Sequence, residues 1–220
     1  MDIRIFKNDA EIGVAAGKLF CDFVKANPGC VLGLATGSSP IPTYNALVEM
    51  YNGNEISFAS VKTVNLDEYV GLTPDHDQSY AYFMRKNLFD RVDIDLANTN
   101  LPSGIAPDAQ AECDRYNALL DTMKQDIQLL GLGSNGHIGF NEPDSELIPN
   151  THLTALTDST IEANSRFFAS EADVPKHALT MGIQSVFKAK KILLMVSGKN
   201  KAEAVKAMVS GNITTRCPAS

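Results

Sequence analysis

The stretch Asp126-Ile-Gln-Leu-Leu-Gly-Leu-Gly-Ser-Asn-Gly-His-Ile-Gly-Phe-Asn-Glu-Pro143 runs from apolar residues into a loop rich in glycine. The apolar residues 127–130 predict a short buried strand. The glycines allow the loop backbone to turn sharply and to approach a ligand closely. A strand that opens into a loop with an imidazole and a carboxylate is more typical of an active site than of a turn that starts a helix. The candidate groups for chemistry are Asn135, His137, Asn141 and Glu142.

Strand and helix patterns alternate from one end of the chain to the other. Short apolar runs, such as residues 31–35, suit strands that are covered on both faces, and the segments between them carry apolar residues at helical spacing. This alternation predicts an α/β fold, a three-layer sandwich with a Rossmann-like, mostly parallel sheet and helices on both faces. We expect strands at 3–6, 31–35, 61–66, 127–130 and 191–196, and helices at 9–25, 40–51, 79–88, 108–123, 160–168 and 200–209.

The composition fits one globular domain over residues 1–220, with 44% hydrophobic and 20% charged residues. A polar, irregular segment at 143–157 predicts a lid over the site, which we extend to residue 168. The net charge of -7 argues against nucleic-acid binding, no apolar run is long enough to span a membrane, and the N-terminus is not a signal peptide. Four scattered cysteines without metal-ligand spacing indicate free thiols in a reducing cytoplasm and no metal site.

The stretch Ala35-Thr-Gly-Ser-Ser-Pro40 follows a predicted strand and precedes a predicted helix. Backbone N–H groups at such a junction, together with the helix dipole, favour a phosphate group, although a simple capped turn is an equally good interpretation. Ser39 is the expected N-cap and Pro40 the first helical residue. In a phosphate site the contacts would come from Gly37, Ser38 and Ser39.

Positive charge is expected at the same edge of the sheet, because ligands of open α/β sheets bind outside the carboxyl ends of the strands. The stretch Ser197-Gly-Lys-Asn-Lys201 again joins a predicted strand to a predicted helix, and its lysines could neutralise a phosphate. Exposed lysines at a helix start are the simpler alternative, but they oppose the helix dipole. Arg166 is a further candidate cation, for which a structural ion pair is the alternative.

Two adjacent carboxylates, Asp67 and Glu68, follow the third predicted strand. A carboxylate at a strand end beside a desolvated pocket is a candidate general base, whereas a pair of solvated loop acids is the simpler alternative. Because neighbours in an extended segment point in opposite directions, we expect only one of them to face a substrate. His137 and Glu142 could share a proton, with Asn135 orienting the imidazole. Together the strand ends predict acid–base chemistry on a phosphorylated small molecule.

Five stretches of the chain resemble the glucosamine-6-phosphate deaminase family in order and spacing, and they span nearly the whole sequence. The most specific is the Gly-His-Ile-Gly-Phe-Asn-Glu-Pro run that ends at Pro143. The resemblance implies an enzyme that converts glucosamine 6-phosphate and water to fructose 6-phosphate and ammonia in amino-sugar catabolism, without a cofactor or a metal. The five stretches are residues 35–44, 65–72, 133–143, 163–168 and 197–202.

The resemblance also implies a role for each site residue. His137 would act as the base that opens the pyranose ring, and Asn135 and Glu142 would hold and tune it. Asp67 would take the proton from C2 of the sugar and return it to C1 through an enolamine. The residues that match the phosphate-holding positions of the family are Gly37, Ser38, Ser39, Arg166 and Lys201.

The chain departs from the family pattern at three points. Asn135 stands where some members have Asp, and it cannot supply a charge that stabilises an imidazolium ion. Members activated by N-acetylglucosamine 6-phosphate carry Arg and Lys where this chain has His152 and Thr154. We therefore expect little or no such activation, and a monomer or a homo-oligomer. Family members continue past the position of Ser220 into a strand and a short helix, so we expect either a truncated chain or an unpaired sheet edge.

Two other functions compete with the deaminase. A 6-phosphogluconolactonase resembles this family in fold and in its glycine-rich His loop, but it would need no base at Asp67. The Asn141-Glu142-Pro143 ending and the Asn65-Leu-Asp-Glu-Tyr69 stretch favour the deaminase. A non-catalytic sugar-phosphate sensor would use the same pocket for binding alone, and the complete set of acid–base groups argues against it.

Overall fold

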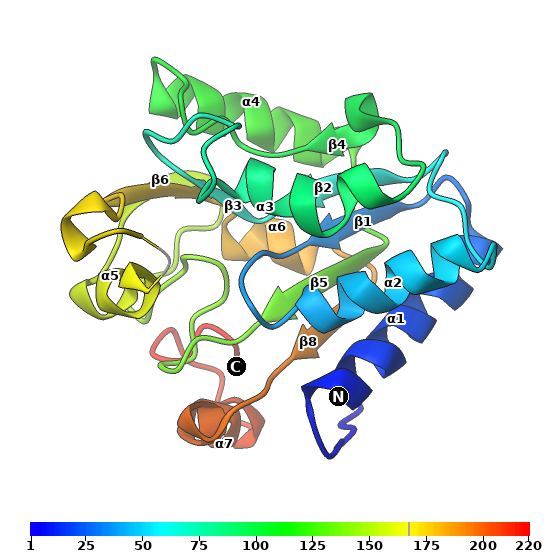
Figure 1. Cartoon of the computed structure of the whole chain (residues 1–220). Coiled ribbons are helices and arrows are strands. Elements are labelled where there is room, and N and C mark those ends of the chain that lie inside the picture. The colour runs from blue at the N-terminus through cyan, green and yellow to red at the C-terminus, as the bar shows by residue number, and fades with distance from the viewer. Residues whose placement is uncertain (167) are drawn as a thin grey trace.

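The computed structural model describes residues 1–166 and 168–220, and it is built around a parallel sheet of five strands (Figure 1). The strand order is β4-β2-β1-β5-β8, and every neighbouring pair runs parallel. The expectation of an α/β fold with a mostly parallel sheet is therefore confirmed. The strands are β1 (Val31–Leu34), β2 (Lys62–Asn65), β4 (Thr99–Asn100), β5 (Ile127–Gly131) and β8 (Ile192–Met195).

The other three strands of the described chain form a second sheet, which is antiparallel and has the order β3-β7-β6. Its members are β3 (Asp67–Tyr69), β6 (His152–Ala155) and β7 (His177–Thr180). Between β2 of the parallel sheet and β3 of this sheet there is a single residue, Leu66. The sequence did not predict this sheet, and the irregular segment expected at 143–157 is wrong for the residues of β6.

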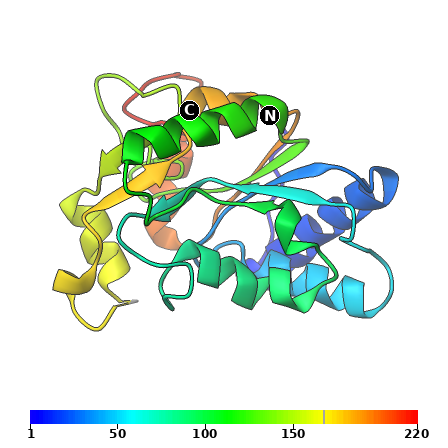
Figure 2. The ribbon, with the colours of Figure 1, turned by 90° about the horizontal axis from the view of Figure 1, so that it is seen from above.

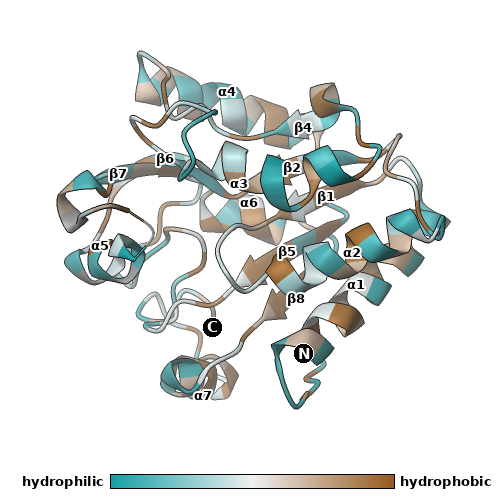
Figure 3. Ribbon diagram, in the orientation of Figure 1, coloured by the Kyte–Doolittle hydropathy of each residue, from teal (hydrophilic) through white to brown (hydrophobic). Residues whose placement is uncertain are grey.

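Helices cover both faces of the parallel sheet, which confirms the three-layer arrangement (Figure 2). Leu32 and Leu34 of β1 pack on the side of α1, α2 and α3, whereas Val64 and Leu130 pack on the side of α4 and α6. The strands β5 and β8 are largely hydrophobic in Figure 3. Residues 127–130 of β5 are buried between the helices, whereas β8 lies at the edge of the sheet and leaves Ile192 exposed. The helices are α1 (Asp9–Ala26), α2 (Ile41–Asn52), α3 (Tyr80–Asn87), α4 (Ala109–Thr122) and α6 (Ile183–Phe187).

Among the remaining helices, α5 (Asp158–Ser165), α7 (Ala202–Val209) and short 3₁₀ turns at Glu171–Asp173 and Lys199–Lys201 lie outside the carboxyl ends of the strands. Two further 3₁₀ turns, at Phe89–Arg91 and Leu96–Asn98, lie between α3 and the start of β4. The predicted helix at 160–168 corresponds to α5, and residue 167 of that prediction lies outside the described residues. Within the described part of the chain, no helix is both long and apolar enough to cross a lipid bilayer.

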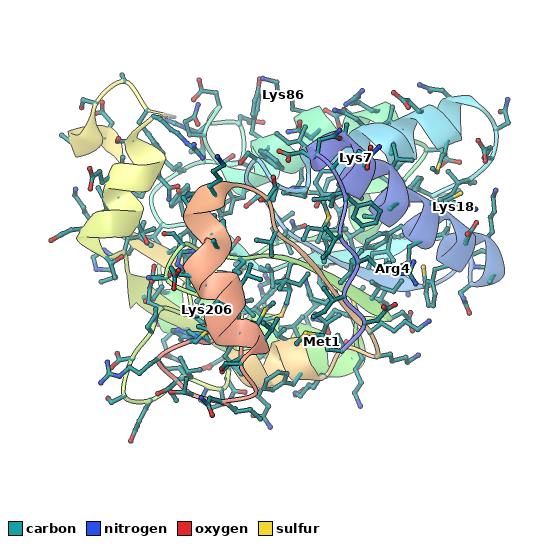
Figure 4. All side chains as sticks on the ribbon, turned by 90° about the horizontal axis from the view of Figure 1, so that it is seen from below. Met1, Arg4, Lys7, Lys18, Lys86 and Lys206 are labelled. Atoms are coloured by element: carbon teal, nitrogen blue, oxygen red, sulfur yellow. The ribbon has the colours of Figure 1, made fainter. Side chains whose placement is uncertain are left out.

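Residues 3–6 do not form the expected strand. The segment is extended, as the labelled Met1 and Arg4 show in Figure 4, and its apolar side chains are exposed, with Ile5 at 92%. The alternation of Ile3 and Ile5 is a strand pattern, but a strand also needs a partner to satisfy its backbone. None of the described strands pairs with this segment.

The close packing of α1 on α2 generates a stability prediction. A Cβ at Gly13 would lie 2.3 Å from the Cβ of Pro42, so Gly13→Ala should lower the free energy of unfolding by about 1–3 kcal/mol, although alanine favours a helix. Urea denaturation measures this loss. Gly29→Ala is the matched control, because nothing lies within 4 Å of a Cβ there. Equal unfolding midpoints for the two variants would contradict the packing argument.

Candidate active site

The loop after β5 places the imidazole of His137 over the backbone of Gly133. The N–H of Gly133 donates to the carbonyl of His137 at 2.9 Å, and the N–H of Gly136 donates to the carbonyl of Gly133 at 3.1 Å, which closes a tight turn. Gly136 has a φ of 90°, in the left-handed region that favours glycine. A Cβ at Gly133 would lie 2.4 Å from the Nε2 of His137. Only glycine at 133 therefore leaves room for the ring.

Glu142 accepts the hydrogen bonds that orient His137. Its Oε2 accepts from Asn135 Nδ2 at 2.6 Å and lies 3.2 Å from His137 Nδ1, while its Oε1 accepts from Thr160 Oγ1 at 2.6 Å. Burial alone would raise the pKa of Glu142, but the bonds and charge of His137, with Thr160 and Asn135, outweigh burial and lower the pKa to about 2. Because the ionised carboxylate only accepts, a neutral imidazole keeps its proton on Nδ1 and presents Nε2 as a base.

The second half of the loop docks on the end of β7. The N–H of Phe140 donates to Thr180 Oγ1 at 3.1 Å, and Asn141 Nδ2 donates to the carbonyl of Met181 at 2.9 Å. Asn141 also donates to the carbonyl of Ile138 at 2.9 Å and is almost fully buried. We expected Asn141 to be a candidate for chemistry, and the structure instead gives it a part in fixing the loop backbone.

This docking brings Asp67 against the loop that carries His137. Thr180 is the register partner of Asp67 in the pair of β3 with β7, so the two side chains stand on the same face of the second sheet. A Cβ at Gly139 would lie 3.0 Å from Thr180 Oγ1 and 3.4 Å from Asp67 Oδ2. The carboxyl of Asp67 therefore faces the open side of Gly139, two residues after the histidine.

Asp67 and Glu68 point to opposite sides, as the extended backbone predicted. Glu68 accepts hydrogen bonds from the N–H groups of Tyr69, Tyr80 and Ala81 at 2.8–2.9 Å, so it holds the start of α3. Burial raises the pKa of Glu68 to about 7, against the effect of these three donors. Burial, with the negative charge of Glu68 added, raises the pKa of Asp67 to about 8. Asp67 is thus the carboxyl that faces the loop and can bind a proton near neutral pH.

The loop between β1 and α2 carries the first candidate phosphate contacts. Gly37 has a φ of 90°, and Ser38 and Ser39 line a hollow of about 90 Å³ together with Ser197 from the loop after β8. Asp9 also lines this hollow and accepts a hydrogen bond from Ser197. The structure thus places these two strand ends beside one another, at the edge where Figure 1 also shows the loop after β5.

The expected N-cap at Ser39 is wrong. The helix α2 begins at Ile41, its N-cap is Pro40, and no side chain makes a capping hydrogen bond there. Pro40 has φ −79° and ψ −13°, so the fixed φ of proline continues the helical backbone by one residue. Ser39 therefore lines the hollow and does not bond the helix end.

Two cations, Lys201 and Arg166, lie within electrostatic range of each other. Burial lowers the pKa of Lys201, and the positive charge of Arg166 lowers it further. Arg166 is the C-cap residue of α5, and the same helix carries Thr160, the donor to Glu142. One short helix therefore reaches from the imidazole–carboxylate pair to the cationic side of the site. No residue-type pattern near Thr160 indicated this contact, and the sequence analysis missed it.

The arrangement supplies a buried carboxyl, an oriented imidazole and two cations at one edge of the sheet, which suits acid–base chemistry on an anionic substrate. Among the described residues, no three His, Cys, Asp or Glu side chains group together in a way that could hold a metal ion. A larger hollow of about 640 Å³ lies at the other end of the sheet, between the ends of α1 and α2, and none of the candidate residues lines it. The candidate site therefore lies away from this hollow.

The contact between Gly133 and His137 leads to a structural prediction. In Gly133→Ala the new Cβ should push the imidazole away from Glu142, so the downfield NMR signal of the Nδ1 proton should broaden or disappear. Gly131→Ala, at the end of β5 two residues before Gly133, is the matched control, because nothing lies within 4 Å of a Cβ at that position. An unchanged Nδ1 signal in Gly133→Ala would show that the ring does not depend on this glycine.

The raised pKa of Asp67 leads to a prediction about pH and stability. Its carboxyl binds a proton more tightly in the folded chain, with a pKa of about 8 against 3.8, so its contribution to stability is full below the lower value and is lost as the pH rises through about 8. The amide of Asn does not titrate, so the stability of Asp67→Asn lacks this dependence on pH. The melting temperature of Asp67→Asn relative to the wild type should therefore increase between about pH 5 and about pH 9. A difference that stays constant over this range would contradict the raised pKa.

Comparison with known proteins gives a consistent picture. Residues 16–220 match the family "Glucosamine-6-phosphate isomerases/6-phosphogluconolactonase". The glucosamine-6-phosphate deaminase of Clostridium perfringens is 53% identical over all of this chain and 91% of its own length. The enzyme of the same name from a Thermoanaerobacter species is 49% identical over all of this chain and 87% of its own length.

Solved structures agree with these relatives. A monomeric glucosamine-6-phosphate deaminase superposes with a TM-score of 0.97 at 44% identity, covering all of this chain and 91% of its own. A 6-phosphogluconolactonase from Thermotoga maritima has a TM-score of 0.77 at 18% identity, covering 98% of this chain and 90% of its own, and shows a shared fold alone. The chain belongs to the glucosamine-6-phosphate deaminase family.

Proposed function

We propose that this protein deaminates glucosamine 6-phosphate, with water, to fructose 6-phosphate and ammonia in amino-sugar catabolism. The observation that carries the proposal is the placement of the buried carboxyl of Asp67 against the loop in which Glu142 orients His137. The reaction needs one base to open a ring and one to move a proton between carbons, and these are two separate groups at one site. The names of relatives at 49% and 53% identity support the same reaction.

His137 opens the pyranose ring in the first step. Its Nε2 takes the proton of the hydroxyl on C1, the bond between C1 and the ring oxygen breaks, and the imidazolium returns the proton to that oxygen. The product is the open-chain aldehyde, and no proton is gained or lost overall. Glu142 stabilises the transient imidazolium through its contact with Nδ1, while Asn135 holds Glu142 in place.

Asp67 then moves a proton between two adjacent carbons. Its carboxylate takes the proton from C2 while the carbonyl oxygen on C1 gains a proton from the ammonium group of the substrate, which gives an enolamine. Asp67 then returns its proton to C1, which leaves a protonated ketimine at C2. Water adds to C2 and ammonia leaves, so the product is fructose 6-phosphate. One carboxylate serves both carbons because they are neighbours on one face of the chain. A pKa of about 8 suits a group that must hold the proton and also release it.

The phosphate group is held between the loops after β1 and β8 and the end of α5. Backbone N–H groups and hydroxyls of the first loop donate to its oxygens, and the two cations balance its charge. The segment 143–168, which includes α5, serves as a lid over the bound sugar. The residues that hold the phosphate in this proposal are Gly37, Ser38, Ser39, Arg166 and Lys201.

The proposal extends to the assembly and location of the protein. We assign residues 1–220 to one domain that acts as a monomer, in line with the monomeric deaminase that it resembles. His152 and Thr154, on β6, lack the cationic pair expected for activation by N-acetylglucosamine 6-phosphate, so turnover is independent of that compound. The four cysteines are all buried free thiols, which suits the reducing cytoplasm.

Ammonia release tests the proposal directly. The purified chain should release ammonia from glucosamine 6-phosphate at the same rate with and without N-acetylglucosamine 6-phosphate. Hydrolysis of 6-phosphogluconolactone without ammonia release would favour the lactonase instead. A folded chain that binds glucosamine 6-phosphate without turnover would favour a sensor and overturn the proposed enzyme.

The division of labour between the two bases gives a prediction. Asp67→Asn should still bind substrate but lose the exchange of the C2 proton with solvent, because the amide cannot take that proton. His137→Gln should slow turnover of the closed ring more than turnover of an open-chain analogue that cannot close. His177→Gln, at an exposed histidine, is the matched control for the second variant. Equal losses of His137→Gln on both substrates would contradict the separate roles.

A further inference from the structure

The last residues of the described chain fold back on themselves. We name residues 214–220 the C-terminal turn. The N–H of Cys217 donates to the carbonyl of Thr214 at 3.1 Å, and the N–H of Thr214 donates to Ser220 Oγ at 2.9 Å. Figure 1 shows this red segment beside the loop that follows β5. The turn follows α7, so it reaches the candidate site from a part of the chain remote in sequence.

The turn contacts the loop immediately before His137. The N–H of Ala219 donates to the carbonyl of Gly136 at 3.0 Å. The side chain of Cys217 is 5% exposed, and a Cβ at Gly136 would lie 2.8 Å from its sulfur. The backbone that carries the imidazole is therefore fixed by a hydrogen bond and by packing from the same turn.

The turn also contacts the loop two residues after Glu142. The N–H of Asp144 donates to the carbonyl of Thr215 at 3.3 Å, and Thr215 Oγ1 donates to the carbonyl of Asp144 at 2.6 Å. Thr215 Oγ1 also lies 3.3 Å from the carbonyl of Ser145. One short segment thus holds the chain on both sides of the imidazole–carboxylate pair.

We propose that the C-terminal turn is a positioning element for His137 and Glu142, and that Thr215 is its main positioning residue. The inference rests on the proposed function, because it concerns the step that His137 performs. Docking on β7 fixes residues 140 and 141, and Thr160 fixes the Glu142 side chain, but the flanks at Gly136 and Asp144 are tied by the turn. A base must be held close to its productive geometry, so loosening these flanks lowers the rate of ring opening.

Thr215 acts on one of the two bases only. Asp67 is placed by β3, whose partner is β7, and among the described residues no hydrogen bond joins the C-terminal turn to either strand. Loss of the Thr215 hydroxyl should therefore slow the step of His137 and leave the proton transfer of Asp67 in place. A general loss of structure would instead affect both steps alike.

The test compares Thr215→Val, Thr215→Ser and the wild type. In Thr215→Val, kcat on glucosamine 6-phosphate should fall about tenfold, with KM unchanged within about twofold. Turnover of an open-chain analogue that cannot close should stay close to the wild-type value. Thr215→Ser keeps the hydroxyl and should restore kcat. Thr122→Val is the matched control, because Thr122 Oγ1 donates to the carbonyl of Leu119 at 2.8 Å on α4, away from the site.

Amide hydrogen exchange gives a second readout that does not need activity. Exchange in peptides that cover residues 136–144 should be faster in Thr215→Val than in the wild type or in Thr122→Val. Equal exchange and equal kcat in the three proteins would overturn the inference, and so would equal losses on the closed and open substrates. Failure of the wild type to release ammonia would overturn the proposed function. The exchange data would still test whether the C-terminal turn holds residues 136–144 in place.

Discussion

The backbone of Leu66 joins the two sheets, and the placement of Asp67 beside the histidine loop depends on it. Its N–H donates to the carbonyl of Leu34 in β1 at 3.3 Å, and its carbonyl accepts from the N–H of Met181, just after β7, at 2.7 Å. One buried residue thus ends the parallel ladder and begins the antiparallel one. Asp67 is the next residue and the first of β3, so its side chain lies buried where the two sheets meet. The burial that raises its pKa is a consequence of this crossing.

Glu142 shows how the other half of the site is assembled from distant segments. A buried carboxylate costs free energy unless it is hydrogen-bonded, and its donors come from the loop itself and from Thr160, 18 residues further along the chain. The same contacts fix the orientation of His137 before any substrate binds. Such preorganisation is a major source of rate enhancement, because the polar groups need not rearrange during the reaction. The helix that supplies Thr160 also ends at Arg166, beside Lys201.

Sequence patterns predicted the long helices and the strands β1, β2, β5 and β8 well, but they missed β4 and the second sheet. The predicted helices at 9–25, 40–51 and 108–123 agree with α1, α2 and α4 within two residues, because each repeats apolar residues over several turns. The strands of the second sheet mix polar with apolar residues, so they lack the apolar run that indicated β1 and β5, and their partners are remote in sequence. The strand predicted at residues 3–6 is wrong for a different reason. Its sequence pattern suits a strand, but no described strand pairs with it.

Three features follow directly from the amino-acid sequence: the alternation of elements, the glycines that a tight loop requires and the types of group available for chemistry. These are local properties, set by side-chain spacing and by the backbone freedom of single residues. Tertiary packing sets which carboxyl of the adjacent pair faces the loop and which holds α3, and it brings Thr160 to Glu142 and Thr215 to Asp144. Thr215 bonds to a residue 71 positions away. Burial and contacts at such separations arise from the packing of the whole chain, so no local pattern encodes them.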